Sequence, residues 1–188
     1  MLEAARQLAA AGVQILQYRN KSGDAARMLI EARELRQRIL FSDRGETVTL
    51  IMNDRADLCL AADFEGVHVG QDDLSPEAAR TIVGADRWLG VSTHNPDQVA
   101  KADHTSADYV AIGPVFGTAS KMNPDPVVGL DGVRAARKLT NKPLVAIGGI
   151  TRANCLSVIE AGADSVAVIS DLVRAPGKSA EEFLRILG

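Results

Sequence analysis

Short apolar runs alternate with longer amphipathic segments along the whole chain. The apolar runs predict buried strands at 13–18, 49–53, 66–69, 88–91, 109–112, 143–147 and 165–169. The amphipathic segments predict helices at 2–11, 24–38, 55–62, 76–83, from 96, and at 131–139, 152–161 and 181–187. Asp24 and Ser75 are residue types that cap helix N-termini, and Gly12 is typical of a helix end. The pattern therefore predicts an α/β protein.

The alternation runs without a linker from one end to the other, which predicts one domain over residues 1–188 with parallel strands and right-handed crossovers. Polar residues follow each predicted strand. An open doubly wound sheet would concentrate its site in two or three loops, so this distribution favours a TIM (β/α)8 barrel. The chain opens with a helix, so we expect a barrel that lacks its first β-strand. A truncated start, imperfect closure or a second chain would each account for this.

Composition and charge argue against some classes of function. The 188 residues carry a net charge of −3, with no basic run and no stripe of aromatic and basic residues, so nothing indicates nucleic acid. No signal peptide opens the chain and no apolar run could span a bilayer, so we expect a cytoplasmic protein without a membrane partner. Cys59 and Cys155 are far apart and are expected to be buried thiols. The oligomeric state is left open, a homo-oligomer included.

The end of the first strand carries the densest polar chemistry, in the stretch Gln17-Tyr18-Arg19-Asn20-Lys21. If the chain stays extended, Gln17, Arg19 and Lys21 share one side. Two cations and an amide at a strand end suit a polyanion, and a diphosphate is the first hypothesis. The alternative is a solvated strand end whose charges pair with nearby carboxylates.

Carboxylates follow the next two strands. Asn53-Asp54 ends one, and Asp72-Asp73 follows the other, although spacing does not tell which of Asp72 and Asp73 faces inward. Two carboxylates from adjacent loops can hold Mg²⁺ together with waters and phosphate oxygens. The alternative is turn and cap chemistry.

A second anion site is predicted across the barrel mouth. Gly148-Gly149 and Ile169-Ser170 follow the last two strands, where barrels bind a phosphate monoester, although a plain tight turn is the alternative for the glycines. The long loop 113–130 offers the hydroxyls of Thr118 and Ser120, and its Lys121 adds a third cation to the strand ends beside Arg19 and Lys21. The three histidines do not have the spacing of a zinc site, and His68 is expected to be a satisfied core residue.

Taken in order, these motifs resemble those of the thiamine-phosphate synthase family over nearly the whole chain. The resemblance is carried by Gln17-x-Arg19-x-Lys21, Asn53-Asp54, Gly66-Val67-His68-Val69-Gly70-Gln71-Asp72-Asp73, Gly90-Val91-Ser92-Thr93-His94, Gly113-Pro114-Val115-Phe116-x-Thr118-x-Ser120-Lys121, Ala146-Ile147-Gly148-Gly149-Ile150 and Val168-Ile169-Ser170. It implies a TIM-barrel transferase that joins hydroxymethylpyrimidine diphosphate to a plain or carboxylated thiazole phosphate and releases pyrophosphate.

The resemblance also implies residue roles. Arg19, Lys21 and Lys121 would be catalytic, and Asp54 and Asp73 would hold Mg²⁺. The pyrimidine diphosphate would be bound by Gln17, Tyr18, Arg19, Asn20, Lys21, Asn53, Ser92 and Lys121. The thiazole phosphate would be bound by Thr118, Ala119, Ser120, Gly149, Ile169 and Ser170.

Three other functions compete with this one. Thiazole tautomerase relatives share the fold and carry out proton transfer, but they tend to have a histidine where this chain has Pro114. A barrel that binds phosphate ligands without turnover is a second alternative. A phosphate-binding barrel of sugar or tryptophan metabolism would share the Gly148-Gly149 and Ile169-Ser170 elements, but it would explain neither the acidic pair nor the residues Gln17–Lys21.

Overall fold

The computed structural model describes residues 1–41, 48–118 and 125–188, in which strands and helices alternate from the first helix to the last. The strands are β1 (Ile15–Tyr18), β2 (Thr49–Asn53), β3 (Gly66–Val69), β4 (Trp88–Thr93), β5 (Tyr109–Ile112), β6 (Leu144–Ile147) and β7 (Ser165–Ala167). The helices are α1 (Leu2–Ala11), α2 (Ala25–Leu40), α3 (Ala56–Ala61), α4 (Pro76–Val83), α5 (Pro96–Asp103), α6 (Gly129–Arg137), α7 (Cys155–Glu160), the short 3₁₀ helix η2 (Ser170–Leu172) and α8 (Pro176–Leu187).

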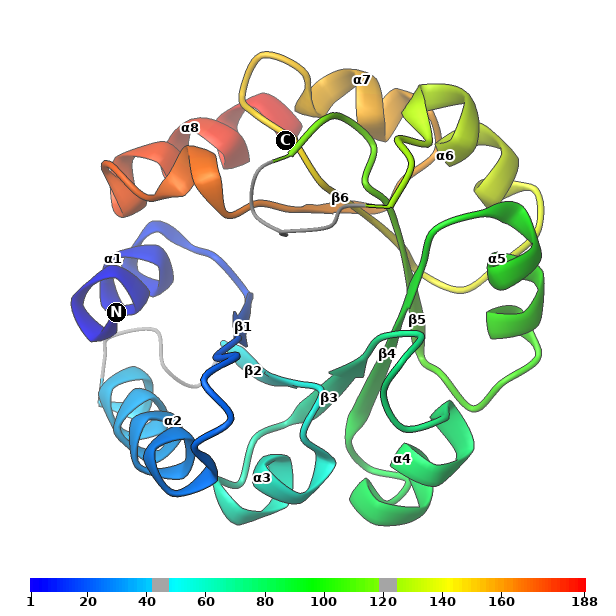
Figure 1. Ribbon diagram of the computed structural model, residues 1–188. Coiled ribbons are helices and arrows are strands. Elements are labelled where there is room, and N and C mark those ends of the chain that lie inside the picture. The colour runs from blue at the N-terminus through cyan, green and yellow to red at the C-terminus, as the bar shows by residue number, and fades with distance from the viewer. Residues whose placement is uncertain (42–47, 119–124) are drawn as a thin grey trace.

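The strands form one parallel sheet in the order of the chain. Each strand from β1 to β6 is hydrogen-bonded to the next one along the sequence. The sheet curves around a central axis and the helices lie outside it (Figure 1). The α/β barrel architecture predicted from the alternation is confirmed. Because all strands are parallel, their carboxyl ends and the loops that follow them lie at one end of the barrel, which we call the rim.

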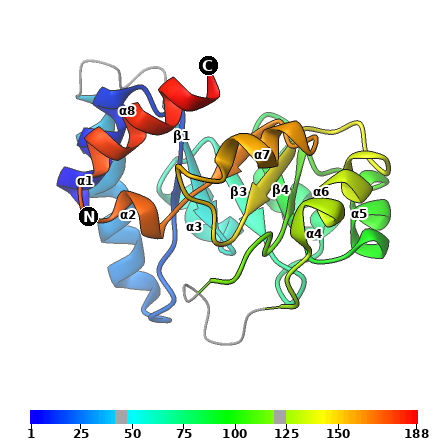
Figure 2. The same ribbon diagram turned by 90° about the horizontal axis from the view of Figure 1, so that it is seen from above.

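The ring is open between β1 and β7, which are not hydrogen-bonded to each other in the described part of the chain. Helices α1 and α8 lie side by side outside this opening (Figures 1 and 2). The contact is close, because a side chain added at Gly177 of α8 would lie 3.4 Å from the backbone oxygen of Gln7 in α1. Seven strands lie in the described ranges and α1 precedes the first of them, as expected for a barrel that lacks its first β-strand.

The core lies on both faces of the sheet. Strand β3 is buried at all of its residues, and most of the large side chains that are almost fully buried come from the strands. This suits parallel strands covered by helices on their outer face. Asp24, Ser75 and Asn95 each accept a hydrogen bond from the backbone N–H three residues on, which fixes where α2, α4 and α5 begin.

The C-terminal part departs most from the pattern predicted from the sequence. The closing helix was expected at 181–187 but begins at Pro176, because proline suits the first turn and Ser179, Ala180 and Phe183 are buried. The last strand ends at Ala167 rather than Ile169, and η2 follows it. Both differences bring additional charged residues to the rim.

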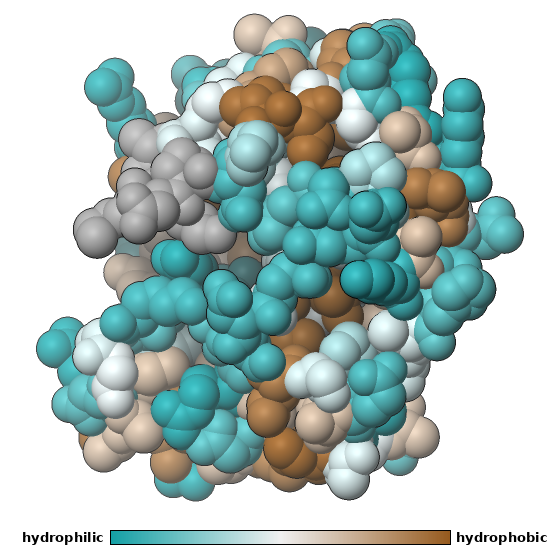
Figure 3. All heavy atoms as spheres, turned by 45° about the vertical axis from the view of Figure 1, so that its right-hand side comes forward, coloured by the Kyte–Doolittle hydropathy of each residue, from teal (hydrophilic) through white to brown (hydrophobic). Residues whose placement is uncertain are grey.

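The surface is mixed. On the face shown in Figure 3, hydrophilic side chains separate smaller apolar patches. Among the helices of the described ranges, none combines the length and the apolar character needed to cross a bilayer.

Candidate active site

Two carboxylates from adjacent loops meet at the rim. Asp54 follows β2 and Asp73 follows β3, and burial raises the pKa of the Asp54 carboxyl. The Lys21 ammonium, which forms an ion pair with Asp54, opposes this shift, and hydrogen bonding with the Asp73 carboxyl adds to it. Two acids and a lysine from three successive rim loops are therefore in direct contact.

Local backbone geometry fixes the directions of the Asp54 and Asp73 carboxylates. Asp54 has φ of +64°, a left-handed conformation that aspartate and asparagine adopt more readily than most residues. Its backbone N–H donates to the His68 carbonyl at 2.8 Å, which ties it to the neighbouring strand. Asp73 accepts a 2.8 Å hydrogen bond from the Gly70 N–H, and a side chain at Gly70 would lie 2.9 Å from the Asp73 Oδ2. Asp73, and not Asp72, is thus the partner of Asp54.

The donors of this pair fit magnesium. Carboxylate oxygens are hard ligands, and Mg²⁺ is bound through one or two of them plus waters and substrate phosphates. Two facing carboxylates also repel each other unless a cation lies near them. Within the described ranges no group of three or more His, Cys, Asp or Glu side chains is placed to hold a metal ion.

The side chains at the end of β1 lie on two opposite faces of the sheet. Tyr18 is buried, and its hydroxyl donates to Glu31 of α2 at 2.7 Å. The Asn20 amide donates to the same Glu31 oxygen at 3.0 Å. Gln17, next to Tyr18 in an extended strand, lies on the opposite face. Arg19 is exposed and forms no ion pair or side-chain hydrogen bond among the described residues.

Two of the predicted ligands of the pyrimidine diphosphate, Tyr18 and Asn20, have side chains that are hydrogen-bonded to Glu31 and stabilise the packing of β1 on α2. The alternation of an extended strand is the reason, because it sends every second side chain outward. The role of Tyr18 and Asn20 as ligands stays a prediction, as does that of Gln17, Arg19 and Lys21.

A row of hydrogen-bonded side chains that the sequence did not reveal lies below the acidic pair of Asp54 and Asp73. The His68 ring contacts the Tyr109 hydroxyl through Nδ1 at 2.9 Å and the Ser92 Oγ through Nε2 at 2.8 Å. Burial lowers the pKa of His68 to about 4, so the imidazole is neutral at pH 7. The expectation of a satisfied core histidine is confirmed, and its partner Ser92 is one of the predicted pyrimidine ligands. Asn53 is buried at the end of β2, directly beside His68 in the register.

The lack of a side chain at Gly90 leaves the space that these hydrogen-bonded side chains occupy. A methyl group there would overlap the Tyr109 ring and the His68 imidazole. We expect Gly90→Ala to lower the free energy of unfolding by about 2 kcal/mol, the scale of overpacking in a core. Urea denaturation measures this, with Gly117→Ala as the control because open space surrounds Gly117. Equal stabilities of the two variants would contradict the packing argument.

The second predicted anion site combines the loops after β5, β6 and β7. Phe116 N–H donates to the Gly148 carbonyl at 3.0 Å, so the loop after β5 lies on the loop after β6. Gly149 has φ of +64° and no room for a side chain beside Phe116 and Gly117. Ile169 and Ser170 are exposed at the start of η2. Thr118 is the last described residue of its loop, and Ala119, Ser120 and Lys121 lie outside the described residues.

The remaining candidates have structural roles. His94 contacts the Gly113 carbonyl through Nδ1 at 2.6 Å and the Asp125 carboxylate through Nε2 at 3.5 Å. Cys59 and Cys155 are buried and free, as expected. Burial raises the pKa of both thiols, which makes them poor nucleophiles.

Comparison with known proteins finds relatives of one family over most of the chain. Residues 1–172 match the family described as thiamine monophosphate synthase. A thiamine-phosphate synthase of Koribacter versatilis is 62% identical over 183 residues, which cover 97% of this chain and 84% of that protein. A thiamine-phosphate synthase of Chloroflexus aurantiacus is 45% identical over 164 residues, covering 87% of this chain and 74% of that protein. The solved structure of thiamine phosphate pyrophosphorylase from Pyrococcus furiosus superposes with a TM-score of 0.88 at 31% identity, covering 99% of this chain and 88% of that one.

Proposed function

Because the chain belongs to the thiamine monophosphate synthase family, we propose that its rim joins a pyrimidine diphosphate to a thiazole phosphate. The products are thiamine phosphate and pyrophosphate. The observation that carries the proposal is that Asp54 forms an ion pair with Lys21 and lies beside Asp73, while Arg19, two residues before Lys21, has no ion-pair partner among the residues that the structure describes. Cationic side chains beside two carboxylates that could hold a metal ion are what a departing diphosphate requires.

The reaction breaks the bond between the pyrimidine methylene and the diphosphate oxygen, and the pyrophosphate leaves with the electron pair. The aminopyrimidine releases electrons to the methylene, so departure can precede attack. The thiazole nitrogen then forms the new bond to the methylene carbon. No proton has to be removed from the nitrogen, so this step needs no general base.

The chain's residues act mainly by charge and position. Arg19 and Lys21 bind the diphosphate oxygens and neutralise the negative charge that grows on them as the bond breaks. Lys121 is proposed to do the same from the loop after β5. Gln17, Asn53 and Ser92 orient the pyrimidine diphosphate, and His68 and Tyr109 hold the Ser92 hydroxyl in place.

Asp54 and Asp73 are proposed to hold Mg²⁺. When bound, the ion supplies electrostatic stabilisation of the pyrophosphate leaving group. The fit of the donor set supports this assignment, because two carboxylates leave the other positions to water and substrate phosphate.

The thiazole phosphate is proposed to bind across the mouth, at Thr118, Ala119, Ser120, Gly149, Ile169 and Ser170. Thr118 and Ser120 offer hydroxyls, and the glycine lets an anion approach the backbone closely. A cytoplasmic location remains a prediction, and the oligomeric state remains open.

The test is a reaction of the purified protein with both substrates and Mg²⁺. We expect pyrophosphate and thiamine phosphate in equal amounts, and neither product when one substrate or the metal is left out. Isomerisation of a thiazole phosphate alone without Mg²⁺ would support the tautomerase alternative and contradict the proposal. Binding of both substrates without turnover would contradict it in favour of a non-catalytic barrel.

A further inference from the structure

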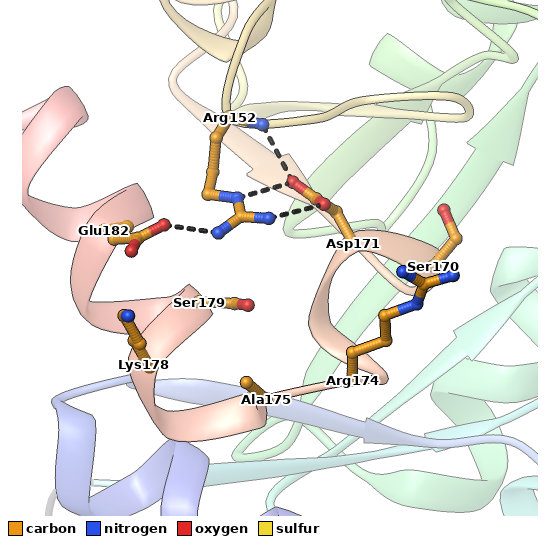
Figure 4. Close-up of a pocket in the computed structure, with 8 residues that line it drawn as sticks. All are labelled: Arg152, Ser170, Asp171, Arg174, Ala175, Lys178, Ser179 and Glu182. Atoms are coloured by element: carbon orange, nitrogen blue, oxygen red, sulfur yellow. Dashed lines mark hydrogen bonds and ion pairs between the residues drawn. The ribbon is translucent and has the colours of Figure 1, made fainter.

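A polar cavity of about 370 Å³ lies between the loop after β6, η2 and the first turns of α8. Figure 4 shows its lining, in which three basic and two acidic side chains surround an opening beside Ser170. The basic residues are Arg152, Arg174 and Lys178, and the acidic ones are Asp171 and Glu182. Arg174 and Lys178 belong to no motif that the sequence analysis identified.

Arg152 is the partner of both acidic residues, Asp171 and Glu182. Its guanidinium donates to the two Asp171 carboxylate oxygens, each at 3.0 Å, and forms an ion pair with Glu182. Its backbone N–H donates to Asp171 at 3.0 Å as well. Hydrogen bonding from Arg152 lowers the pKa of the Asp171 carboxyl, so this acid is ionised at neutral pH. The cluster fixes the β6 loop, η2 and α8 relative to one another.

Arg174 and Lys178 are left without such partners. Neither forms an ion pair or a side-chain hydrogen bond among the residues that the structure describes, and both are exposed. The residues that line the cavity therefore carry a net positive charge. In Figure 4 the Arg174 guanidinium lies beside Ser170, whereas Arg152 turns toward the two acids.

The proposed ligands of the thiazole phosphate lack a cation of their own. Thr118, Ala119, Ser120, Gly149, Ile169 and Ser170 are all uncharged. A phosphate monoester carries about −1.5 to −2 charges at pH 7 and has three strong acceptor oxygens. Hydrogen bonds from a charged donor to such an anion are roughly twice as strong as neutral ones. Arg174 and Lys178 line a cavity together with Ser170, and neither is paired with another of the described residues.

We propose that Arg174 and Lys178 bind the phosphate of the thiazole substrate beside Ser170 and so set the enzyme's preference for a phosphorylated thiazole. This inference rests on the proposed function. Arg174 contacts the phosphate directly, Lys178 adds a second positive charge, and Arg152 is a positioning residue that holds η2 and α8 around the anion.

The experiment compares Arg174→Gln, Lys178→Gln and the double variant with Arg185→Gln. Arg185 is an exposed arginine on the same helix that does not line the cavity, so the control removes the same charge. We expect Arg174→Gln to raise KM for thiazole phosphate about tenfold. KM for the pyrimidine diphosphate and kcat at saturation should stay within twofold of wild type. Binding of the dephosphorylated thiazole alcohol should not change.

Calorimetry with inorganic phosphate tests the cavity without turnover. We expect phosphate binding to weaken in Arg174→Gln and in the double variant, and to be unchanged in Arg185→Gln. Unchanged phosphate affinity and thiazole KM would overturn the inference, as would an equal rise of both KM values. A wild-type protein that releases no pyrophosphate would instead overturn the proposed function, while the calorimetric result would still decide whether this cavity is an anion site.

Discussion

Replacing Arg19 by alanine is expected to lower kcat by about 100-fold or more, the scale for losing a donor that stabilises transition-state charge. Arg19 directly follows β1 and has no ion pair among the described residues, so the substitution breaks no ion pair there. Its planar fork of donors can bind two diphosphate oxygens at once. The loss should therefore be larger in kcat than in substrate affinity, because negative charge on the diphosphate grows as the bond breaks.

Steady-state pyrophosphate release measures this effect. Arg38→Ala is the matched control, because Arg38 is an exposed arginine on α2 and also lacks an ion pair in the described part of the chain. Arg19→Lys should recover part of the lost rate, since it restores the charge without the fork. A kcat of Arg19→Ala within a few-fold of wild type would remove Arg19 from the mechanism.

Much of the fold follows from local signals in the sequence. The apolar runs predicted the order and type of the seven strands in the described ranges, and the caps Asp24, Ser75 and Asn95 mark where three helices begin. Local signals failed at α8, where Gly177 and Lys178 interrupt the apolar pattern although the helix continues through them. Packing of the helix against α1 outweighs the poor propensity of glycine there.

The candidate site was predictable as a set of loops but not as a set of side-chain directions. Strand ends of a parallel barrel share one rim, so Asp54 and Asp73 could be paired from the sequence. The choice between Asp72 and Asp73 depended on the turn at Gly70. The outward direction of Tyr18 and Asn20 depended on their hydrogen bonds to Glu31 in α2. The first is a contact within one turn and the second is a tertiary contact, and the spacing of the residues encodes neither.

Asp54→Asn is expected to lower turnover by about 100-fold or more and to abolish the response of the remaining activity to Mg²⁺. Asparagine has nearly the shape of aspartate and also tolerates the left-handed backbone at this position, where φ is +64°. The variant should therefore fold. It loses one of two carboxylates that are proposed to hold the metal, and it removes the partner of Lys21. Because one of two facing acids is gone, its stability without metal should not fall below that of wild type.

Two measurements separate a metal site from a purely structural pair. Titration calorimetry with Mg²⁺ and pyrophosphate on the unreacted protein should show binding in wild type and none in Asp54→Asn. Asp72→Asn is the control, because Asp72 is an exposed carboxylate beside Asp73 in the same loop, and the pKa of Asp54 is shifted by Asp73 and not by Asp72. Urea denaturation in the presence of a chelator tests the stability. If Asp54→Asn binds Mg²⁺ with pyrophosphate as wild type does, the two carboxylates are not the metal site, and the stabilisation of the leaving group would have to come from the cations alone.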